Sequence, residues 1–241
     1  MPASFPDEAL KAQAVVARTY TSRRMRTNRH DGAAVCMDPG CCQGYTAEAD
    51  YLASGGSAEN VDRLRAAVAE TAGQVLTYEG ALIDATYFSC SGGQTEDAVA
   101  VWGQDVPYLQ SVESPGEEDA PRYSETVTFT PAQFRALTGC GGGDDPNAWF
   151  GPVTHTDGGG VDTMEICDAE YSGTELRGLL GLRSTAFTLE VVDGNIVITT
   201  LGFGHRVGMS QYGARAMALN GADYTEILSH YYTGTELEQM E

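Results

Sequence analysis

The sequence predicts an α+β fold, in which helices and β-hairpins occupy separate stretches of the chain. Three observations indicate this class. An alanine-rich stretch without Gly or Pro predicts a helix over 8–26, turn signals at Glu79-Gly80 and Asp193-Gly194-Asn195 predict hairpins, and no regular strand–helix alternation is present. The 241 residues suffice for one sizeable core or two small ones. We expect one domain over 1–241, with a second lobe or insertion at about 113–190.

The first elements follow from local signals. Ser4 and Asp7 have the spacing of a capping box, with Pro6 in the first turn, and this places Glu8 in the first turn of the helix over 8–26. Residues 27–46 are expected to form an irregular loop. A second helix is predicted over 58–72, because five residues share one face: Val61, Leu64, Ala67, Val68 and Thr71.

The later elements alternate between hairpins, loops and short helices. Strands are predicted over 75–78 and 82–87, and loops over 113–123 and 139–160. A strand over 126–130 leads into a helix that begins at Thr130-Pro131. A hairpin joins 187–192 to 196–200, and helices follow over about 210–219 and 224–232.

The charge distribution is uneven. The net charge of −20 argues against nucleic acid and anionic membrane surfaces as partners. Six of the fourteen basic residues nevertheless lie in the first thirty positions: Lys11, Arg18, Arg23, Arg24, Arg26 and Arg29. This segment predicts a site for an anionic substrate, and the alternative is a basic helix face that pairs with acidic residues of the fold.

The six cysteines predict a metal site. Three of them fall within seven residues, and His30, Cys36 and Cys42 have the spacing His-x5-Cys-x5-Cys. One imidazole and two thiolates suit tetrahedral Zn²⁺, with a water or a fourth side chain completing the site. Cys41 competes for the ligand role and Cys90 could supply a fourth ligand, while a disulfide among these cysteines is the alternative.

Another pair, Cys140 and Cys167, flanks a Gly-rich stretch. This pair could form a disulfide in an oxidising compartment, and the sequence leaves that pairing open.

Four ordered blocks of sequence resemble the stage II sporulation protein D family. They are the opening block with Glu8-Ala9-Leu10-Lys11-Ala12-Gln13, then Ser89 to Glu96 with Val101-Trp102, then Leu182 to Thr185, and finally Gly204 to Ala214. Tyr231 to Thr235 closes the pattern, and Cys42-Gln43-Gly44-Tyr45 resembles the last ligand block of zinc-binding members. The resemblance therefore extends over most of the chain.

The resemblance implies a lytic transglycosylase that cleaves peptidoglycan glycan strands, with Glu8 as its one catalytic residue. The carboxyl protonates the glycosidic oxygen between MurNAc and GlcNAc, and then acts as a base while the muramoyl C6 hydroxyl closes a 1,6-anhydro ring, so no second carboxylate is needed. Lys11 and the first-turn position favour the carboxylate, whereas a desolvated cleft would favour the acid. The alternative is that Glu8 only caps the helix and pairs with Lys11.

Further residues of these blocks are candidates for substrate binding: Lys11, Arg18, Ser91, Gly92, His205, Ser210 and Gln211. As alternatives, His205 could be a structural residue and Ser91-Gly92-Gly93 a tight turn. Arg206 stands where the family commonly has Gly, which puts the backbone conformation of that loop in question.

Two other functions compete with the transglycosylase. Relatives described as amidase enhancers imply a non-catalytic glycan-binding protein, and Cys90 with His205, or the metal site, would suggest a hydrolase. The resemblance further implies an extracytoplasmic location, between the membranes of the mother cell and the forespore, and an N-terminal membrane anchor that these residues do not contain. A cell-wall amidase that strips peptide stems from the glycan is the expected protein partner.

Overall fold

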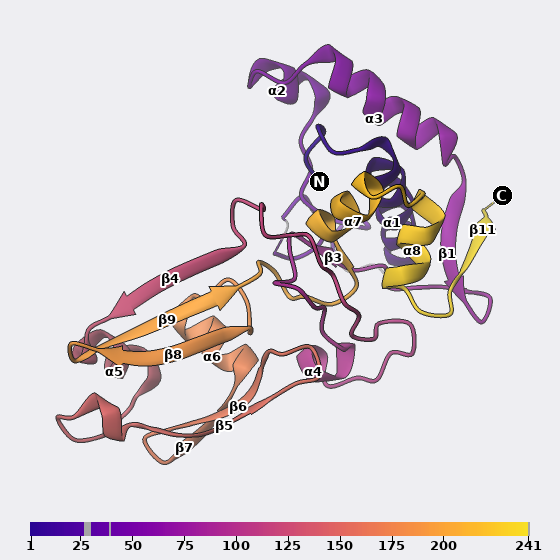
Figure 1. Cartoon of the computed structure of the whole chain (residues 1–241). Coiled ribbons are helices and arrows are strands. Elements are labelled where there is room, and N and C mark those ends of the chain that lie inside the picture. Colours follow the sequence, from indigo (N-terminus) through magenta and orange to yellow (C-terminus); the bar gives the residue numbers. More distant parts are fainter. Residues whose placement is uncertain (27–29, 39, 241) are drawn as a thin grey trace. The chain divides into compact units, whose positions relative to one another are not determined.

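The computed structural model describes residues 1–26, 30–38 and 40–240 (Figure 1), so Arg29 of the basic segment lies outside the described residues. The chain divides into two compact units, of which the first comprises Met1–Tyr87 and Ala214–Glu241 and the second Phe88–Gly213. The second unit is therefore an insertion, in sequence, into the first. Helices and four small sheets give the predicted α+β class. Within the described residues, none of the helices combines the length and the apolar character needed to cross a membrane.

The first unit is built on α1 (Asp7–Arg24), which packs against α3 (Ala58–Glu70), β1 (Gln74–Tyr78) and α8 (Tyr224–Tyr231). The buried face of α1 consists of seven residues: Ala9, Leu10, Ala12, Val15, Val16, Thr19 and Tyr20. Thr19 joins helix to sheet, because its hydroxyl donates to the Val15 carbonyl at 2.8 Å and accepts from the Leu76 amide at 2.9 Å.

The sheet of the first unit has the order β11-β1-β2, with β11 at Glu236–Gln239 and β2 at Ala81–Leu82. Gln74 pairs with Gln239, so the strand after α3 is completed by the last strand of the chain. The short α2 (Glu48–Ala53) precedes α3, and α7 (Gln211–Leu219) precedes α8.

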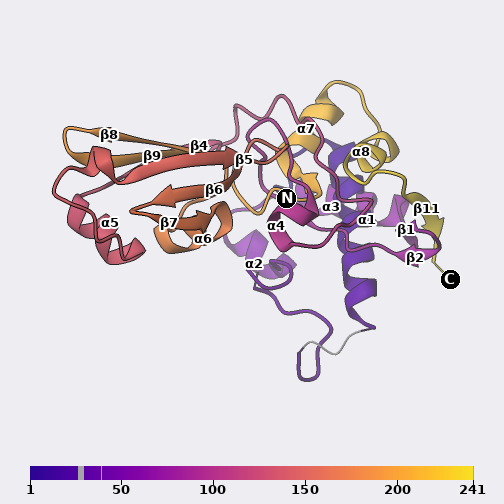
Figure 2. The same cartoon turned by 90° about the horizontal axis from the view of Figure 1, so that it is seen from below.

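The second unit contains two antiparallel three-stranded sheets with helices packed on them (Figure 2). One sheet has the order β4 (Ser124–Phe129), β9 (Asn195–Leu201), β8 (Phe187–Val192). The other has the order β5 (Phe150–His155), β6 (Val161–Ile166), β7 (Ala169–Ser172). The helices are α4 (Ala98–Trp102), α5 (Pro131–Thr138) and α6 (Gly173–Leu180), with a 3-10 turn at Pro146–Ala148. A ribbon of β3 (Tyr87–Phe88) and β10 (Met209–Ser210) completes the sheets.

The core of the second unit lies between these sheets and helices. It contains large buried side chains from α5, α6, the strands and the 3-10 turn region, among them Phe134, Trp149, Ile166, Leu176, Ile196 and Ile198. A disulfide joins Cys140, just after α5, to Cys167, in the turn between β6 and β7, across a Cα–Cα distance of 5.4 Å. The pairing that the sequence left open is therefore present.

Most of the predicted elements are confirmed. The hairpin over 187–192 and 196–200, the strand before Thr130 and the helices near 8–26, 210–219 and 224–232 occur within a few residues of their expected bounds. Thr130 caps α5 through a complete capping box with Gln133.

Other predictions were wrong. The predicted capping box at Ser4 and Asp7 is not formed, because Pro6 is the N-cap of α1 and no side chain caps it. Of the five residues predicted to share one face of the second helix, Val61, Ala67 and Thr71 are buried, whereas Val68 is 53% exposed. The loop predicted over 139–160 contains β5, an edge strand with Gly151 and Pro152 in its sequence and little burial. Pro and Gly are read as loop signals, and an edge strand tolerates both.

Candidate active site and metal centre

Glu8 lies in the first turn of α1, where it contacts the start of α8. One carboxylate oxygen accepts a hydrogen bond from the Tyr224 backbone amide at 2.9 Å, and the other accepts from Lys11 Nζ at 2.8 Å. Tyr224 is the first residue of α8, so its amide is one of those left without a partner inside that helix. The Glu8 side chain remains 32% exposed, so a substrate can reach the carboxyl.

Lys11 connects α1 to α3. Its ammonium lies 2.7 Å from a Glu70 carboxylate oxygen as well as 2.8 Å from Glu8. The hydrogen bonds that Lys11 donates to Glu70 and Glu8 raise its pKa above the usual range, so Lys11 is a cation at every physiological pH. The predicted neighbours Glu8 and Lys11 are therefore in contact, and Lys11 is shared between two carboxylates.

Arg18 lies about two turns beyond Lys11 on the same face of α1. Its guanidinium donates to the Gln74 carbonyl at 2.9 Å, and it lines a largely apolar groove of about 930 Å³ together with residues of α2, α3 and the segment around Tyr45. Glu8 and Lys11 are not among the lining residues of that groove. The structure thus places the two predicted cationic contacts, Lys11 and Arg18, in different surroundings.

The other basic residues of α1 contact their own unit. Arg23 donates to the Leu82 carbonyl at 2.6 Å, and Arg24 pairs with Asp84 at 3.1 Å. Arg26, just beyond the helix, is exposed. Arg23 and Arg24 therefore attach α1 to the chain around residues 82–84. This agrees in part with the alternative that the basic helix face pairs with acidic residues of the fold.

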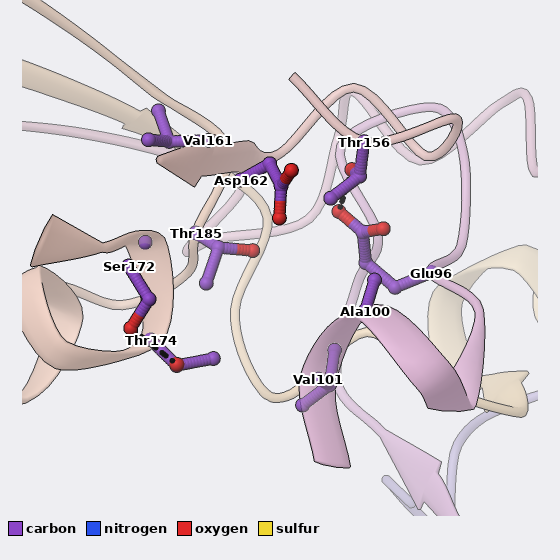
Figure 3. Close-up of a pocket in the computed structure, with 10 residues that line it drawn as sticks. Glu96, Ala100, Val101, Thr156, Val161, Asp162, Ser172, Thr174 and Thr185 are labelled. Carbon is purple, nitrogen blue, oxygen red and sulfur yellow. Dashed lines mark hydrogen bonds between the residues drawn. The ribbon is translucent and has the colours of Figure 1, made fainter. Parts of the chain in front are cut away.

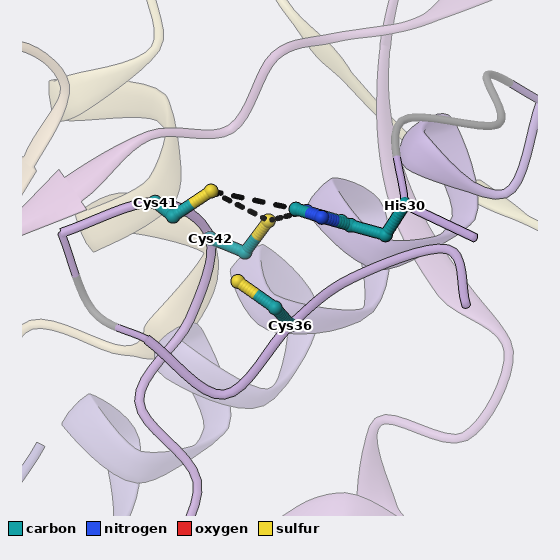
Figure 4. A group of neighbouring side chains, drawn as sticks. All are labelled: His30, Cys36, Cys41 and Cys42. Atoms are coloured by element: carbon teal, nitrogen blue, oxygen red, sulfur yellow. Dashed lines mark hydrogen bonds between the residues drawn. The ribbon is translucent and has the colours of Figure 1, made fainter. Parts of the chain in front are cut away.

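The predicted metal ligands are brought together in the loop after α1 (Figure 4). The ligand atoms of His30, Cys36, Cys41 and Cys42 all lie within 4.8 Å of one another, so this group could hold a metal ion. A backbone hydrogen bond from Cys36 lowers the pKa of Cys42 to about 6, and His30 adds to that effect. A side-chain hydrogen bond with Cys36 raises the pKa of Cys41 to about 11, although a bound metal ion deprotonates a coordinating thiol outright.

Gln43 connects the loop that contains the candidate metal ligands (the metal loop, His30 to Cys42) to the rest of the first unit. Its amide nitrogen donates to Thr21 Oγ1 at 2.8 Å, and its amide oxygen accepts from the Tyr87 hydroxyl at 3.0 Å. Gln43 therefore links this loop both to the last turns of α1 and to Tyr87, the residue that precedes the second unit.

In the second unit, Ser91 and Gly92 bind a buried carboxylate. Glu117 Oε2 accepts from the Ser91 amide at 2.5 Å, the Ser91 hydroxyl at 2.9 Å and the Gly92 amide at 3.1 Å, and Oε1 accepts from the Ser114 hydroxyl at 2.6 Å. Ser91 and Glu117 are both fully buried. Glu117 lies in the loop that was predicted over 113–123, and no motif of the sequence singles it out.

His205 has aromatic neighbours. Its ring lies 5.6 Å from that of Phe88 and 5.4 Å from that of Trp102, and its Nδ1 accepts from the Val207 amide at 3.1 Å. Trp102 is 45% exposed at the end of α4, so its indole and the His205 ring offer an aromatic surface of the kind on which a sugar ring can pack. Trp102 was part of a family block but was not among the predicted binding residues.

Arg206 has a structural role that the sequence did not indicate. It has φ 65°, a conformation that glycine adopts readily, and its side chain is 2% exposed. The guanidinium donates to the carbonyls of Ser91, Gln94 and Gly158 and pairs with Glu96 at 2.9 Å. Arg206 therefore holds the His205 loop to the segment that follows Ser91.

Glu96 also lines a small cavity of about 30 Å³ (Figure 3). Asp162, Thr156 and Thr185 lie around it, and this volume matches one or two water molecules and not a sugar. Burial raises the pKa of Glu96 despite the opposing charge of Arg206. None of the predicted site residues lines this cavity.

Ser210 and Gln211 stand at the start of α7. Ser210 is fully buried, and its hydroxyl accepts from the Gly213 amide at 3.1 Å, which is the contact that an N-cap makes. Gln211 is the first residue of the helix and is partly exposed. Of this pair, only Gln211 offers a side chain to a ligand.

Comparison with known proteins extends over the whole chain. The family model described as stage II sporulation protein (SpoIID) matches residues 1–78. Stage II sporulation protein D of Bacillus amyloliquefaciens is 41% identical over 248 residues, and the alignment covers all of this chain and 71% of that protein. Stage II sporulation protein D of Bacillus subtilis is 39% identical over 247 residues, and that alignment covers all of this chain and 71% of that protein. The amidase enhancer of Bacillus subtilis is 30% identical over 98% of this chain and 39% of its own length.

Proposed function

Because the chain belongs to the stage II sporulation protein D family, we propose that it is a peptidoglycan lytic transglycosylase of sporulation. It cleaves the β-1,4 bond between MurNAc and GlcNAc in glycan strands without peptide stems and leaves 1,6-anhydroMurNAc ends. The observation that carries this proposal is the setting of Glu8, a reachable carboxyl in the first turn of α1 whose two oxygens accept hydrogen bonds from the Lys11 ammonium and the Tyr224 backbone amide.

The reaction requires one proton to leave Glu8 and another to return. The protonated carboxyl donates to the glycosidic oxygen as the C1–O bond breaks, and the departing GlcNAc keeps that proton on its new hydroxyl. The resulting carboxylate then accepts the proton of the muramoyl C6 hydroxyl, whose oxygen bonds to C1 and closes the 1,6-anhydro ring. Water does not enter the balance, so one carboxyl serves as acid and then as base.

The neighbours of Glu8 support the second half of this cycle. Lys11 and the Tyr224 amide stabilise negative charge on the carboxylate that forms when the bond breaks. A glycan that covers Glu8 removes water and favours the neutral acid before cleavage. Lys11 also has Glu70 as a partner, so it can stay paired while the Glu8 carboxyl is protonated.

The second unit supplies further candidates for substrate binding. Gln211, partly exposed at the start of α7, and His205, next to the exposed indole of Trp102, suit contacts with sugar hydroxyls and apolar sugar faces. Ser91 and Gly92 contribute by shaping their loop around Glu117, since the Ser91 hydroxyl and both amides are already bonded.

The metal is zinc in this proposal. His30, Cys36 and Cys42 provide imidazole and thiolate, the ligands that Zn²⁺ prefers, and their ligand atoms are close enough to share one ion. When bound, zinc contributes stability by cross-linking the loop, and it takes no part in the proton transfers of Glu8.

Replacing Glu8 tests the proposal. Glu8→Gln keeps the shape and hydrogen-bonding ability of the side chain but cannot exchange a proton, so formation of 1,6-anhydro ends should fall by at least ~10²–10⁴-fold while glycan binding persists. Mass spectrometry of digested denuded peptidoglycan measures the product. Asp7→Asn is the matched control, because it removes the neighbouring first-turn carboxylate, which pairs with Arg63 and not with Lys11, and it should keep most of the activity. Wild-type turnover by Glu8→Gln would refute the assignment.

The similarity to an amidase enhancer defines the second candidate function. A glycan-binding enhancer would yield no anhydro ends, yet it would raise the rate at which a cell-wall amidase removes peptide stems. Both measurements on one preparation separate the two functions. A cysteine hydrolase is disfavoured, because the Cys90 thiol is fully buried and burial raises its pKa to about 11, which keeps it protonated at neutral pH.

The cellular setting is part of the proposal. The Cys140–Cys167 disulfide is typical of proteins outside the reducing cytoplasm. We place the protein between the membranes of the mother cell and the forespore, where an amidase that exposes the glycan is its expected partner.

A further inference from the structure

Cys41 lies inside the group of metal ligands, although the family resemblance accounts only for His30, Cys36 and Cys42. Cys41 Sγ is 3.8 Å from His30 Nε2 and 4.0 Å from Cys42 Sγ, and Cys42 Sγ is 3.2 Å from His30 Nε2 (Figure 4). Zinc–ligand bonds of 2.3 Å to sulfur and 2.0–2.1 Å to nitrogen imply tetrahedral edges of about 3.8 Å between sulfurs and about 3.6 Å between sulfur and nitrogen. The separations of Cys41 therefore match those of a ligand.

The backbone brings the two adjacent sulfurs together. The amides of Cys41 and Cys42 both donate to the Asp38 carbonyl, at 3.1 and 2.8 Å, and the Gly40 amide donates to Asp38 Oδ1 at 2.8 Å. This tight turn places both thiols beside the His30 ring. Hydrogen bonds from these three amides to Asp38 therefore set the positions of the two thiols.

The other candidates for a fourth ligand are elsewhere. Cys90, which the spacing left open, is buried in the second unit and its thiol donates to the Arg122 carbonyl at 3.8 Å. Among the described residues, no carboxylate belongs to the group around His30. One imidazole and three thiols are therefore what the structure offers to the metal.

We propose that Cys41 is the fourth ligand, so that three thiolates and one imidazole close the coordination sphere and leave no position for water. The inference rests on the proposed zinc site and goes beyond it. Four protein ligands are characteristic of structural zinc, whereas catalytic zinc keeps an open position. A closed site cannot activate water, and this agrees with a reaction from which water is excluded.

X-ray absorption at the zinc edge of the intact chain tests this coordination without reference to activity. The wild type should show three sulfurs at about 2.3 Å and one nitrogen at about 2.0–2.1 Å. Cys41→Ser should show two sulfurs and two lighter ligands, and chelator competition should give an affinity at least ~10-fold lower. Cys90→Ser removes the buried thiol of the second unit and should leave the three-sulfur site unchanged. The thiolate-to-metal absorption of the cobalt form should fall by about one third in Cys41→Ser only.

Each other outcome overturns the inference. Two sulfurs in the wild type would show that Cys41 is not a ligand, while the zinc proposal would stand. A mapped disulfide that includes Cys41 would likewise exclude it. A chain without zinc would remove both the zinc proposal and this inference, and the role of Glu8 would still be decided by its own product assay.

Discussion

Glu117 shows how one buried carboxylate can shape a loop that carries a family motif. It accepts hydrogen bonds from two amides and two hydroxyls, and these donors are already in place when a ligand arrives. A carboxylate with that many donors is stable inside a protein because its lone pairs are satisfied. The Ser91-Gly92 turn therefore owes its shape to a residue 25 positions further along the chain.

Removing this carboxylate should destabilise the second unit. Glu117→Ala leaves several buried donors unsatisfied at roughly 1–3 kcal/mol each, so we expect the free energy of unfolding to fall by at least about 3 kcal/mol. Urea denaturation followed by tryptophan fluorescence measures the change. Glu118→Ala, an exposed neighbour, is the control and should change stability by less than about 0.5 kcal/mol. Similar effects of the two variants would contradict this role for Glu117.

At the same scale, the sequence predicted contacts within one helix but not contacts between distant segments of the chain. The contact of Glu8 with Lys11 follows from the i, i+3 spacing on a helix, and the structure has it. The contacts of Glu8 with Tyr224 and of Ser91 with Glu117 join distant parts of the sequence, and no local pattern encodes them. Arg206 looked like an exception to a glycine position, and it is a buried residue that keeps the positive φ.

At the scale of elements, Gln43 attaches the metal loop to α1 through its hydrogen bond to Thr21. Purified chain should contain about one zinc, and Cys36→Ser should lose it and melt at a lower temperature, because an ion that binds only the folded state adds to its stability. Elemental analysis and calorimetry measure both properties. Absence of zinc together with a mapped Cys36–Cys42 disulfide would contradict the prediction.

Gln43→Ala provides a comparison that separates the metal from its attachment. This variant should retain its zinc, since Gln43 is not a ligand, yet melt earlier because the contacts with Thr21 and Tyr87 are lost. Loss of zinc from Gln43→Ala would instead indicate that the attachment is needed to form the site.

Elements with strong end signals were the predictable ones. Thr130 before α5 and the Asp193-Gly194 turn between β8 and β9 are encoded within a few residues, and both are as expected. The sheet β5-β6-β7 was not recognised as a whole, because β5 has a proline and a glycine and only β6 has several buried residues. The short α2 has no side-chain cap and no buried residue, so its sequence contains no signal to find.

At the scale of the whole molecule, a net charge of −20 must still allow an anionic glycan to bind. Each MurNAc of a denuded strand carries a lactyl carboxylate. Arg18 and Arg23 donate to backbone carbonyls, which do not neutralise them, so their positive charge remains available at short range. Binding of denuded peptidoglycan should therefore weaken with salt, since exposed charges are screened over ~10 Å at 0.1 M.

Neutral chito-oligosaccharide is the matched ligand for this measurement. Titrations of both ligands across a range of salt concentrations should show a steep dependence for peptidoglycan and a shallow one for the neutral sugar. Equal dependence for the two ligands would mean that the basic residues of α1 serve the fold alone.

The insertion of the second unit into the first has a consequence for the time at which each can form. Chains emerge from the ribosome N-terminus first, and domains generally fold as units during synthesis. All of Phe88–Gly213 is synthesised before α8 and β11. By contrast, β1 can pair with β11 only after Gln239 has been added, and Glu8 can accept its hydrogen bond only after Tyr224 has been added. The inserted unit can fold early, and the surroundings of the proposed catalytic acid are assembled last. A chain interrupted before α8 would thus hold a folded second unit, while Glu8 would lack its contact with Tyr224.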